Sequence, residues 1–409
     1  MKLNAMTIIS SFVLFFSMIQ PNLNAGIDEA NEKKADSRVI EAAKGSNEFS
    51  FALYRRLAAA GGNVVIAPMS ISSAFTMLYA GAGASTRNEI ERVFAFRSRG
   101  DAHLYSWKAL SDDISKRGRG GAFRFSDACR VWVAKDEKVK DGYLSLIKKH
   151  FNSGVGRVDF REHAEQARKE INEWTSKNTQ GIIKEIVPSG ACSDQTRMLI
   201  VNAVYFLGKW IHPFDPDRTF PADFYLTKTK KVTAQFMKAK GHYRYTATPE
   251  LQMVSIPYEG HVSFIIVLPK RMDGLAALER KMTRPFWERL IDQMDWHEVN
   301  LQVPRFRSSY AADLIPPLRN MGMNRAFTEK ADFSGIAPLL YVNGTFHRAY
   351  IAVDEKGTEA AAATEIDMVK ADGDTPVWFR ADHPFLYAVW DNRTGAILFI
   401  GRLADPTKP

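Results

Sequence analysis

Residues 355–374 read EKGTEAAAATEIDMVKADGD. Helix propensity alone favours a helix here, because four alanines lie between glutamates. Read with a period of two, the segment is instead a strand whose uncharged face carries Thr358, Ala360, Ala362, Thr364, Ile366 and Met368. The first four of these side chains are small, so such a strand can enter an existing sheet without overpacking it. The segment therefore suits two states, an exposed loop and a buried strand, and Gly357 leaves the backbone free to turn where the strand would enter.

The rest of the chain alternates irregularly between helical and strand patterns. Apolar residues at helical spacing predict helices at residues 38–57, 70–80 and 163–177, and the capping box formed by Thr86 and Glu89 predicts the start of another. Nearly uninterrupted apolar runs predict buried strands, the clearest at residues 198–206 (MLIVNAVYF). We find no linker, no internal repeat and no βαβ phosphate-binding turn. The sequence therefore predicts one α+β domain.

Residues 1–25 differ from the rest. A positive start at Lys2 precedes an apolar run from Met6 to Ile19, and small Ala25 closes a cleavage site, which is typical of a secretory signal peptide. The run is shorter than the roughly 20 residues that span a bilayer. We therefore expect a secreted, extracellular protein formed by residues 26–409. Secretion makes the sequons at Asn343 and Asn392 predicted glycosylation sites.

The two cysteines do not form a disulfide framework. A chain of 409 residues with 45% hydrophobic residues can be stabilised by burial alone. One bridge between Cys129 and Cys192 is open to the sequence, but two unbridged thiols are favoured, because Cys129 lies in a run typical of a buried strand.

The formal net charge of +9 suits polyanionic partners. The basic residues are scattered, which favours solubility as their role and leaves a sulfated glycosaminoglycan as the alternative partner. We expect no nucleic-acid or membrane partner, and a monomer.

Catalytic signatures are missing from the sequence. It contains no G-x-S-x-G, H-E-x-x-H, G-x-x-x-x-G-K-[ST] or G-x-G-x-x-G motif, and its nine histidines show no metal-ligand spacing. A dispersed Ser/His/Asp triad stays open, but we expect no enzyme, no metal and no cofactor.

Several ordered motifs together resemble those of the serpin family. The segment EKGTEAAAAT at residues 355–364 is similar to the serpin hinge, and further matches are NVVIAPMSISSAFTML (63–78), NAVYFLGKW (202–210), VPRF (303–306), FTEKADFSGI (327–336) and 383–406. The resemblance implies a serpin fold of three β-sheets, about nine helices and an exposed reactive-centre loop at about residues 356–377. It also implies a suicide-substrate inhibitor of serine proteases, in which the cleaved loop inserts into the central sheet and traps the acylated protease.

The resemblance also assigns residues by position. The hinge comprises Glu355, Gly357, Thr358, Glu359, Ala360, Ala361, Ala362, Ala363 and Thr364. The region where the sheet opens comprises Ser70, Asn172, His347 and Trp210. Counting along the loop places the reactive bond at Ala371–Asp372, which suits an elastase-like protease; a shift of one residue gives Lys370–Ala371, which suits a trypsin-like one.

Three features depart from the family pattern. One of them is the loop, which is slightly longer than in some relatives on its C-terminal side, before residues 383–385. Ala67 stands where the family usually has serine, so one hydroxyl is lost near Ser70, and Pro316-Pro317 should shorten a helix.

The alternative function is that of a non-inhibitory serpin that acts as a carrier, chaperone or storage protein. Such members tend to carry bulky, charged or proline residues in the hinge, which this hinge lacks apart from the expected Glu359.

Overall fold

The computed structural model describes residues 35–119, 121, 123–151, 154–357 and 376–409. Within these residues the α-helices are α1 (Ser37–Ala58), α2 (Pro68–Gly81), α3 (Ala84–Val93), α4 (Gly100–Arg119), α5 (Asp141–His150), α6 (Phe160–Asn178), α7 (Leu275–Lys281), α8 (Arg284–Asp292) and α9 (Ile315–Asn320). None of the described helices is long and apolar enough to cross a bilayer.

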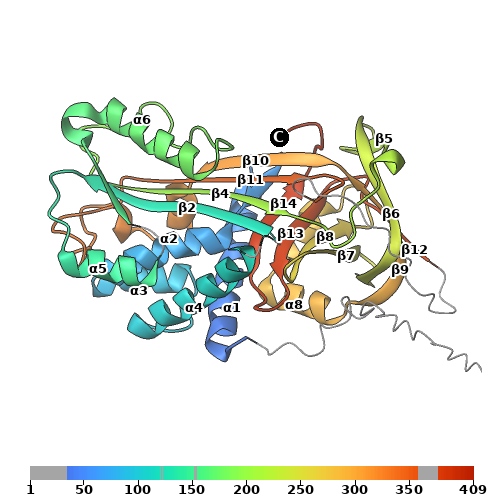
Figure 1. The fold of residues 1–409 in the computed structure, drawn as a ribbon, viewed down its shortest axis with the longest axis horizontal. Coiled ribbons are helices and arrows are strands. Elements are labelled where there is room, and N and C mark those ends of the chain that lie inside the picture. Colours follow the sequence, from blue (N-terminus) through green and yellow to red (C-terminus); the bar gives the residue numbers. More distant parts are fainter. Residues whose placement is uncertain (1–34, 120, 122, 152–153, 358–375) are drawn as a thin grey trace, which may run out of the picture. The chain divides into compact units, whose positions relative to one another are not determined.

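A five-stranded sheet lies at the centre of this part of the chain (Figure 1). Its strands, in spatial order, are β10 (Phe306–Asp313), β11 (Gly344–Val353), β4 (Met198–Gly208), β2 (Phe123–Ala134) and β3 (Val155–Val158). The two middle strands, β11 and β4, run parallel, in a register that places His347 opposite Asn202. Helix α6 lies on one side of the sheet, and α2 with its neighbouring helices on the other (Figure 1).

The second sheet has nine strands. They are β1 (Val64–Ile66), β14 (Ile397–Leu403), β13 (Phe385–Asp391), β8 (Val262–Pro269), β7 (Leu251–Tyr258), β6 (Lys231–Ala247), β9 (Asp295–Pro304), β12 (Val377–Arg380) and β5 (Phe220–Tyr225). The long strand β6 pairs with β9 over residues 236–245 but with β7 only over 244–247. The nine strands therefore divide at β6 into two parts, which with the central sheet correspond to the three sheets that the family resemblance implies.

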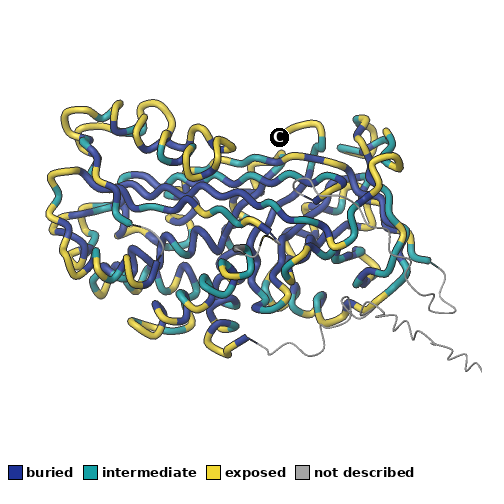
Figure 2. The backbone as a smooth tube through the Cα atoms, viewed as in Figure 1, coloured by how far each residue is buried: buried dark blue, intermediate teal, exposed yellow. Residues whose placement is uncertain are grey.

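Burial on both faces explains why the central strands read as apolar runs. Along β2, Cys129, Val131 and Val133 pack into the main core, whereas Ala128 and Trp132 alternate with them and pack on the α6 side. Figure 2 shows the central strands as mostly buried between exposed outer loops.

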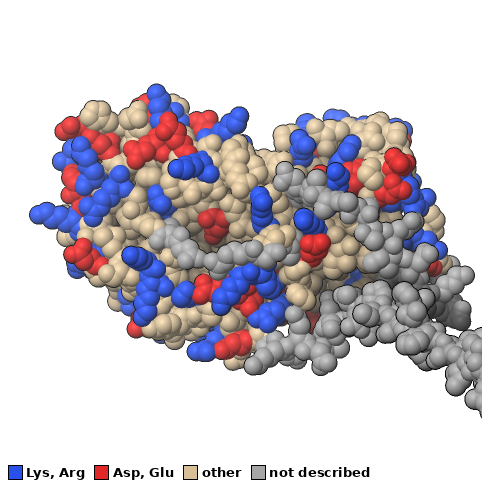
Figure 3. Space-filling view, viewed as in Figure 1, with Lys and Arg blue, Asp and Glu red and all other residues tan. Residues whose placement is uncertain are grey.

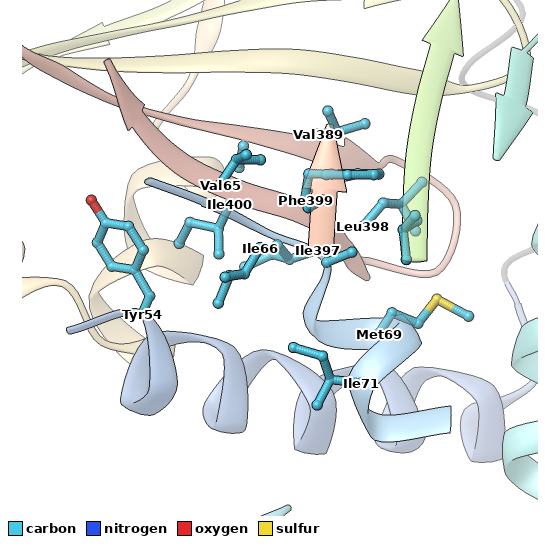
Figure 4. Packing of buried hydrophobic residues seen from close by; sticks show 14 of the residues in the cluster. Tyr54, Val65, Ile66, Met69, Ile71, Val389, Ile397, Leu398, Phe399 and Ile400 are labelled. Atoms are coloured by element: carbon cyan, nitrogen blue, oxygen red, sulfur yellow. The ribbon is translucent and has the colours of Figure 1, made fainter. Parts of the chain in front are cut away.

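The main core joins elements from both ends of the sequence. Val65 and Ile66 of β1 pack beside Ile397 and Ile400 of β14, above Met69 and Ile71 on α2 (Figure 4). The last strand of the chain thus completes a core that the first helices begin.

Two local predictions had different outcomes. The predicted capping box is wrong, because α3 begins at Ala84 and the side chains of Thr86 and Glu89 serve tertiary contacts. The Thr86 hydroxyl accepts from the Asp332 N–H at 2.9 Å, and Glu89 accepts from the N–H groups of Asn324 and Arg325 at the start of η3 (Arg325–Phe327). The predicted short helix at Pro316-Pro317 is confirmed, since α9 has six residues and begins with these prolines in its first turn.

A buried ion pair ties α1 and α7 to β14. The Arg402 guanidinium lies 3.2 Å from both carboxylate oxygens of Glu279 and donates to the Gly62 carbonyl at 2.7 Å. The Tyr54 hydroxyl donates to Glu279 Oε1 at 2.6 Å. Arg402 and Glu279 are both less than 10% exposed, so neither charge is compensated by water.

We predict that Arg402→Met lowers the free energy of unfolding by about 3 kcal/mol, because it leaves the Glu279 carboxylate buried without its cation. The double variant Arg402→Met/Glu279→Leu should recover most of this loss, because it removes both charges. Urea unfolding at pH 7.5 measures the effect. A single variant as stable as the wild type would contradict the role given to this pair.

Candidate functional site

A chain of hydrogen bonds crosses the middle of the central sheet. The Ala67 N–H donates to His347 Nε2 at 3.3 Å, and His347 Nδ1 donates to Asn202 Oδ1 at 2.7 Å. Asn202 Nδ2 then donates to Ser70 Oγ, and the Ser70 hydroxyl donates to Asp127 Oδ1 at 2.5 Å. All donors therefore point the same way, from the start of α2 to a carboxylate on β2, an order in which each bond polarises the next.

This chain holds the two middle strands together where their side chains face the core. His347 on β11 and Asn202 on β4 are register partners, and both are buried. Separating β4 from β11 would break the His347–Asn202 bond and leave buried polar groups without partners, at about 1–3 kcal/mol each. The cluster is therefore placed where it resists opening of the sheet.

Burial keeps His347 neutral. Loss of water around the ring lowers the pKa of His347 to about 3, although its bond to Asn202 acts weakly in the opposite direction. The partners agree with a neutral ring, since Nδ1 faces the Asn202 carbonyl oxygen and Nε2 accepts from a backbone N–H.

The structure brings together only part of the predicted cluster. Ser70 and His347 are joined as expected, but through Asn202, and Ser70 bonds onward to Asp127. The sequence prediction named neither Asn202 nor Asp127. Asn172 lies on α6 and bonds elsewhere: its Oδ1 accepts from the N–H groups of Ile186 and Val187, and its Nδ2 donates to the Val187 carbonyl, all at 3.0 Å. Asn172 thus holds the segment after α6, and placing it in the cluster was a mistake.

A sequence signal for the two missed residues existed. Asn202 is the one polar residue in the apolar run 198–206, and Asp127 is a charged residue directly before the strand-like run 128–134. Buried polar residues in such runs need partners. Their connection to Ser70 depends on how α2 packs under the sheet, which sequence spacing does not give.

The chain that leaves β11 is anchored at the end of β4. The Trp210 indole N–H donates to the Asp354 carbonyl at 2.8 Å, and its ring stacks on Tyr258 with centroids 4.0 Å apart. Gly357 bridges to Lys209 and to Asp354. Its φ of +111° and the Gly208 carbonyl at its α-carbon leave no room for a side chain, so glycine is required here.

Glu355 adds a side-chain anchor. Its carboxylate accepts from the Thr219 hydroxyl at 2.7 Å and lies 3.4 Å from the Arg305 guanidinium, while its carbonyl accepts from the Phe214 N–H at 2.8 Å. The start of the predicted hinge is therefore fixed between the adjacent ends of β4 and β11. Thr358, Glu359, Ala360–Thr364 and the predicted reactive bond lie outside the described residues.

The predicted glycosylation sites differ in exposure. Asn392 is exposed in the turn between β13 and β14, although its Nδ2 donates to Ser263 Oγ at 3.0 Å. Asn343 is half-buried, and its Oδ1 accepts from the N–H groups of Arg197 and Met198 at the start of β4. Exposure favours Asn392 as the glycosylation acceptor.

Cys129 and Cys192 are not joined in a disulfide, as the sequence favoured.

One group of side chains in the described residues has the types and spacing of metal ligands. Asp159, Glu162 and His163 at the start of α6 offer ligand atoms within 4.8 Å of one another. Asp159 already accepts from Lys135 Nζ at 2.6 Å and lies 2.8 Å from His163 Nδ1. These contacts make it a helix-start network stabilised by a cation that the protein itself supplies.

Comparisons with known proteins agree with this geometry. A family model described as Serpin (serine protease inhibitor) matches residues 44–406. An uncharacterized serpin-like protein of Methanosarcina acetivorans is 33% identical over 94% of this chain and 92% of its own length. A leukocyte elastase inhibitor of Xenopus tropicalis is 34% identical over 88% of this chain and 97% of its own length. The structure of human thyroxine-binding globulin in complex with thyroxine matches with a TM-score of 0.83 and 26% identity, and it covers 90% of this chain and 100% of that structure.

We predict that the contribution of His347 to stability depends on pH. Its pKa is about 3 in the folded chain and about 6.5 when unfolded, so only the unfolded chain takes up a proton between these values. The free energy of unfolding should therefore fall as the pH falls from about 6.5 towards 3. Between pH 7.5 and pH 4.5 the free energy of unfolding of the wild type should fall by about 2–3 kcal/mol more than that of His347→Gln.

Urea unfolding of both proteins at the two pH values measures this difference. His163→Gln is the control, since the side chain of His163 is 65% exposed. The difference in free energy of unfolding between this variant and the wild type should not become smaller at the lower pH. A gap between wild type and His347→Gln that is the same at both pH values would refute the prediction.

Proposed function

This chain belongs to the serpin family, and from that membership we propose that it is a secreted inhibitor that traps serine proteases as a suicide substrate. In this mechanism the protease cleaves the loop between Gly357 and Val377, and the freed hinge enters the central sheet between β4 and β11. The acylated protease is carried along and its active site is distorted. We propose no catalytic activity and no cofactor for the chain itself.

One observation carries this proposal: the hinge begins beside the seam that it would enter. Gly357 bridges to Lys209 just beyond β4, and the chain reaches it directly from β11. A strand that continues from Gly357 therefore starts between these two strands and needs only their separation. Each ladder hydrogen bond gained would contribute about 0.5–1.5 kcal/mol, against the cost of breaking the His347–Asn202 bond.

The alternative is a serpin that does not insert its loop. The similarity to thyroxine-binding globulin keeps a carrier role in view. The small, uncharged side chains expected to face the sheet, at Thr358, Ala360 and Ala362, favour insertion. Heating after loop cleavage separates the two functions, because an inserted strand raises the melting temperature strongly and an uninserted one does not.

The sequence supports our proposals for the target and the compartment. We propose Ala371–Asp372 as the reactive bond and an elastase-like target, with Lys370–Ala371 and a trypsin-like target as the alternative. The mass of the released C-terminal fragment decides between them.

On the face in Figure 3, lysines and arginines are interspersed with acids, so a sulfated glycosaminoglycan is a secondary proposal. We also propose a monomer, glycosylation at Asn392 before Asn343, and a mature chain that begins at Gly26 after removal of residues 1–25.

We predict that Thr358→Arg converts the inhibitor into a substrate. Thr358 is the first side chain expected to point into the sheet, and an unpaired buried charge costs several kcal/mol, enough to slow insertion at least about tenfold. The protease would then complete hydrolysis and leave. The measurement is the number of inhibitor molecules consumed for each SDS-resistant complex formed.

The matched control is Glu359→Arg, which places the same side chain on the opposite face of the strand. It should keep nearly the wild-type stoichiometry. Complex formation by Thr358→Arg at the wild-type stoichiometry would rule out the insertion mechanism as proposed.

A further inference from the structure

The outward face of strands β6, β9 and β12 carries two exposed tryptophans. Trp296 on β9 is 52% exposed and Trp378 on β12 is 61% exposed. The register places Trp378 opposite Asn300, four residues along β9 from Trp296, so both rings stand on the same face about 13 Å apart along the strands. Neighbouring residues such as Leu301 and Phe379 point to the core on the other face. Large exposed aromatic side chains of this kind mark interaction surfaces.

Positive charge surrounds these rings. The register sets Lys238, Lys240 and Arg244 of β6 and Arg380 of β12 on the same face. Glu298 is the acid on this face of the three strands, and it lies 2.9 Å from Lys240 Nζ, while Asp382 just beyond β12 lies 3.3 Å from Arg380. The basic groups therefore exceed the acids, and the face fits an acidic partner.

The position of β12 identifies that partner. Trp378 follows the proposed reactive residue Ala371 by seven residues, so the chain allows at most about 25 Å between them. A protease bound at Ala371 is wider than this distance, so part of its surface can reach the face of β6, β9 and β12. Tryptophan and arginine are also the residues that most often dominate binding energy at protein–protein contacts.

We propose that the outward face of β6, β9 and β12 is an accessory binding surface for the target protease, and this inference rests on the proposed function. Asp372 and Asp374 come before β12, so the protease meets two acids beside the reactive bond and the basic face beyond them. The partner that fits is a serine protease with an acidic surface patch. This patch lies away from the catalytic residues, on the side that binds the residues after the cleaved bond. Such complementarity raises the association rate more than it changes the later steps.

The experiment uses the full chain and the second-order rate constant for formation of the covalent complex, with every protease that the wild type inhibits. Lys238→Glu/Lys240→Glu should lower this rate constant at least tenfold at 50 mM NaCl for the preferred protease, and the loss should shrink at 300 mM NaCl. Trp378→Ala should lower it about three- to tenfold at both salt concentrations. The stoichiometry should stay unchanged in both variants.

The charge-matched control is Lys148→Glu/Lys184→Glu, since both lysines are exposed and lie away from this face, Lys148 on α5 and Lys184 in the segment after α6. Equal thermal midpoints show that the variants are folded. Rate constants within twofold of this control for all inhibited proteases would overturn the inference and leave the proposed function intact. Loss of retention on heparin with unchanged rate constants would also overturn it, because the face would then bind polysaccharide. A wild type that traps no protease would overturn both proposals.

Discussion

The parallel pairing of β4 and β11 is the constraint on which the rest of the structure depends. In the central sheet β11 runs parallel to β4, and β2 runs parallel to β3, while the other two pairings are antiparallel. The predicted hinge starts at the end of the β4–β11 pair. The His347–Asn202–Ser70–Asp127 chain fastens the pair to α2 and β2 from the core side. Stability alone would not require buried polar side chains between β4 and β11, because burying apolar side chains of the same volume costs less free energy.

The two ends of this seam are held by different kinds of contact. In the middle, buried hydrogen bonds must break together before the strands separate. At the hinge end, Trp210 packs on Tyr258 and Gly357 fits against Gly208 and Lys209, so the backbone is fixed by stacking and by close approach. The anchor therefore sets where a new strand would begin, and the polar chain sets how strongly the sheet resists it.

The central sheet and the strands β6, β9 and β12 differ in how their faces are buried. Strand β4 of the central sheet is buried along nearly its whole length, with one buried cluster on each of its faces. The strands β6, β9 and β12 bury one face and leave the other to solvent, with its tryptophans and basic side chains. Substitutions on the exposed face can therefore leave the packing of the core unchanged.

The sequence by itself determined the α+β class and the buried central strands, because these depend on local periodicity, and it placed a glycine where the chain turns at residue 357. It also located Ser70, His347 and Trp210 through the family resemblance. Only the tertiary structure decided that Asn202 and Asp127, rather than Asn172, complete the polar cluster, and that Thr86 and Glu89 bond distant segments instead of capping α3. The physical reason is that hydrogen-bond partners far apart in the chain are chosen by how helices pack on the sheet, which residue spacing along the chain does not encode.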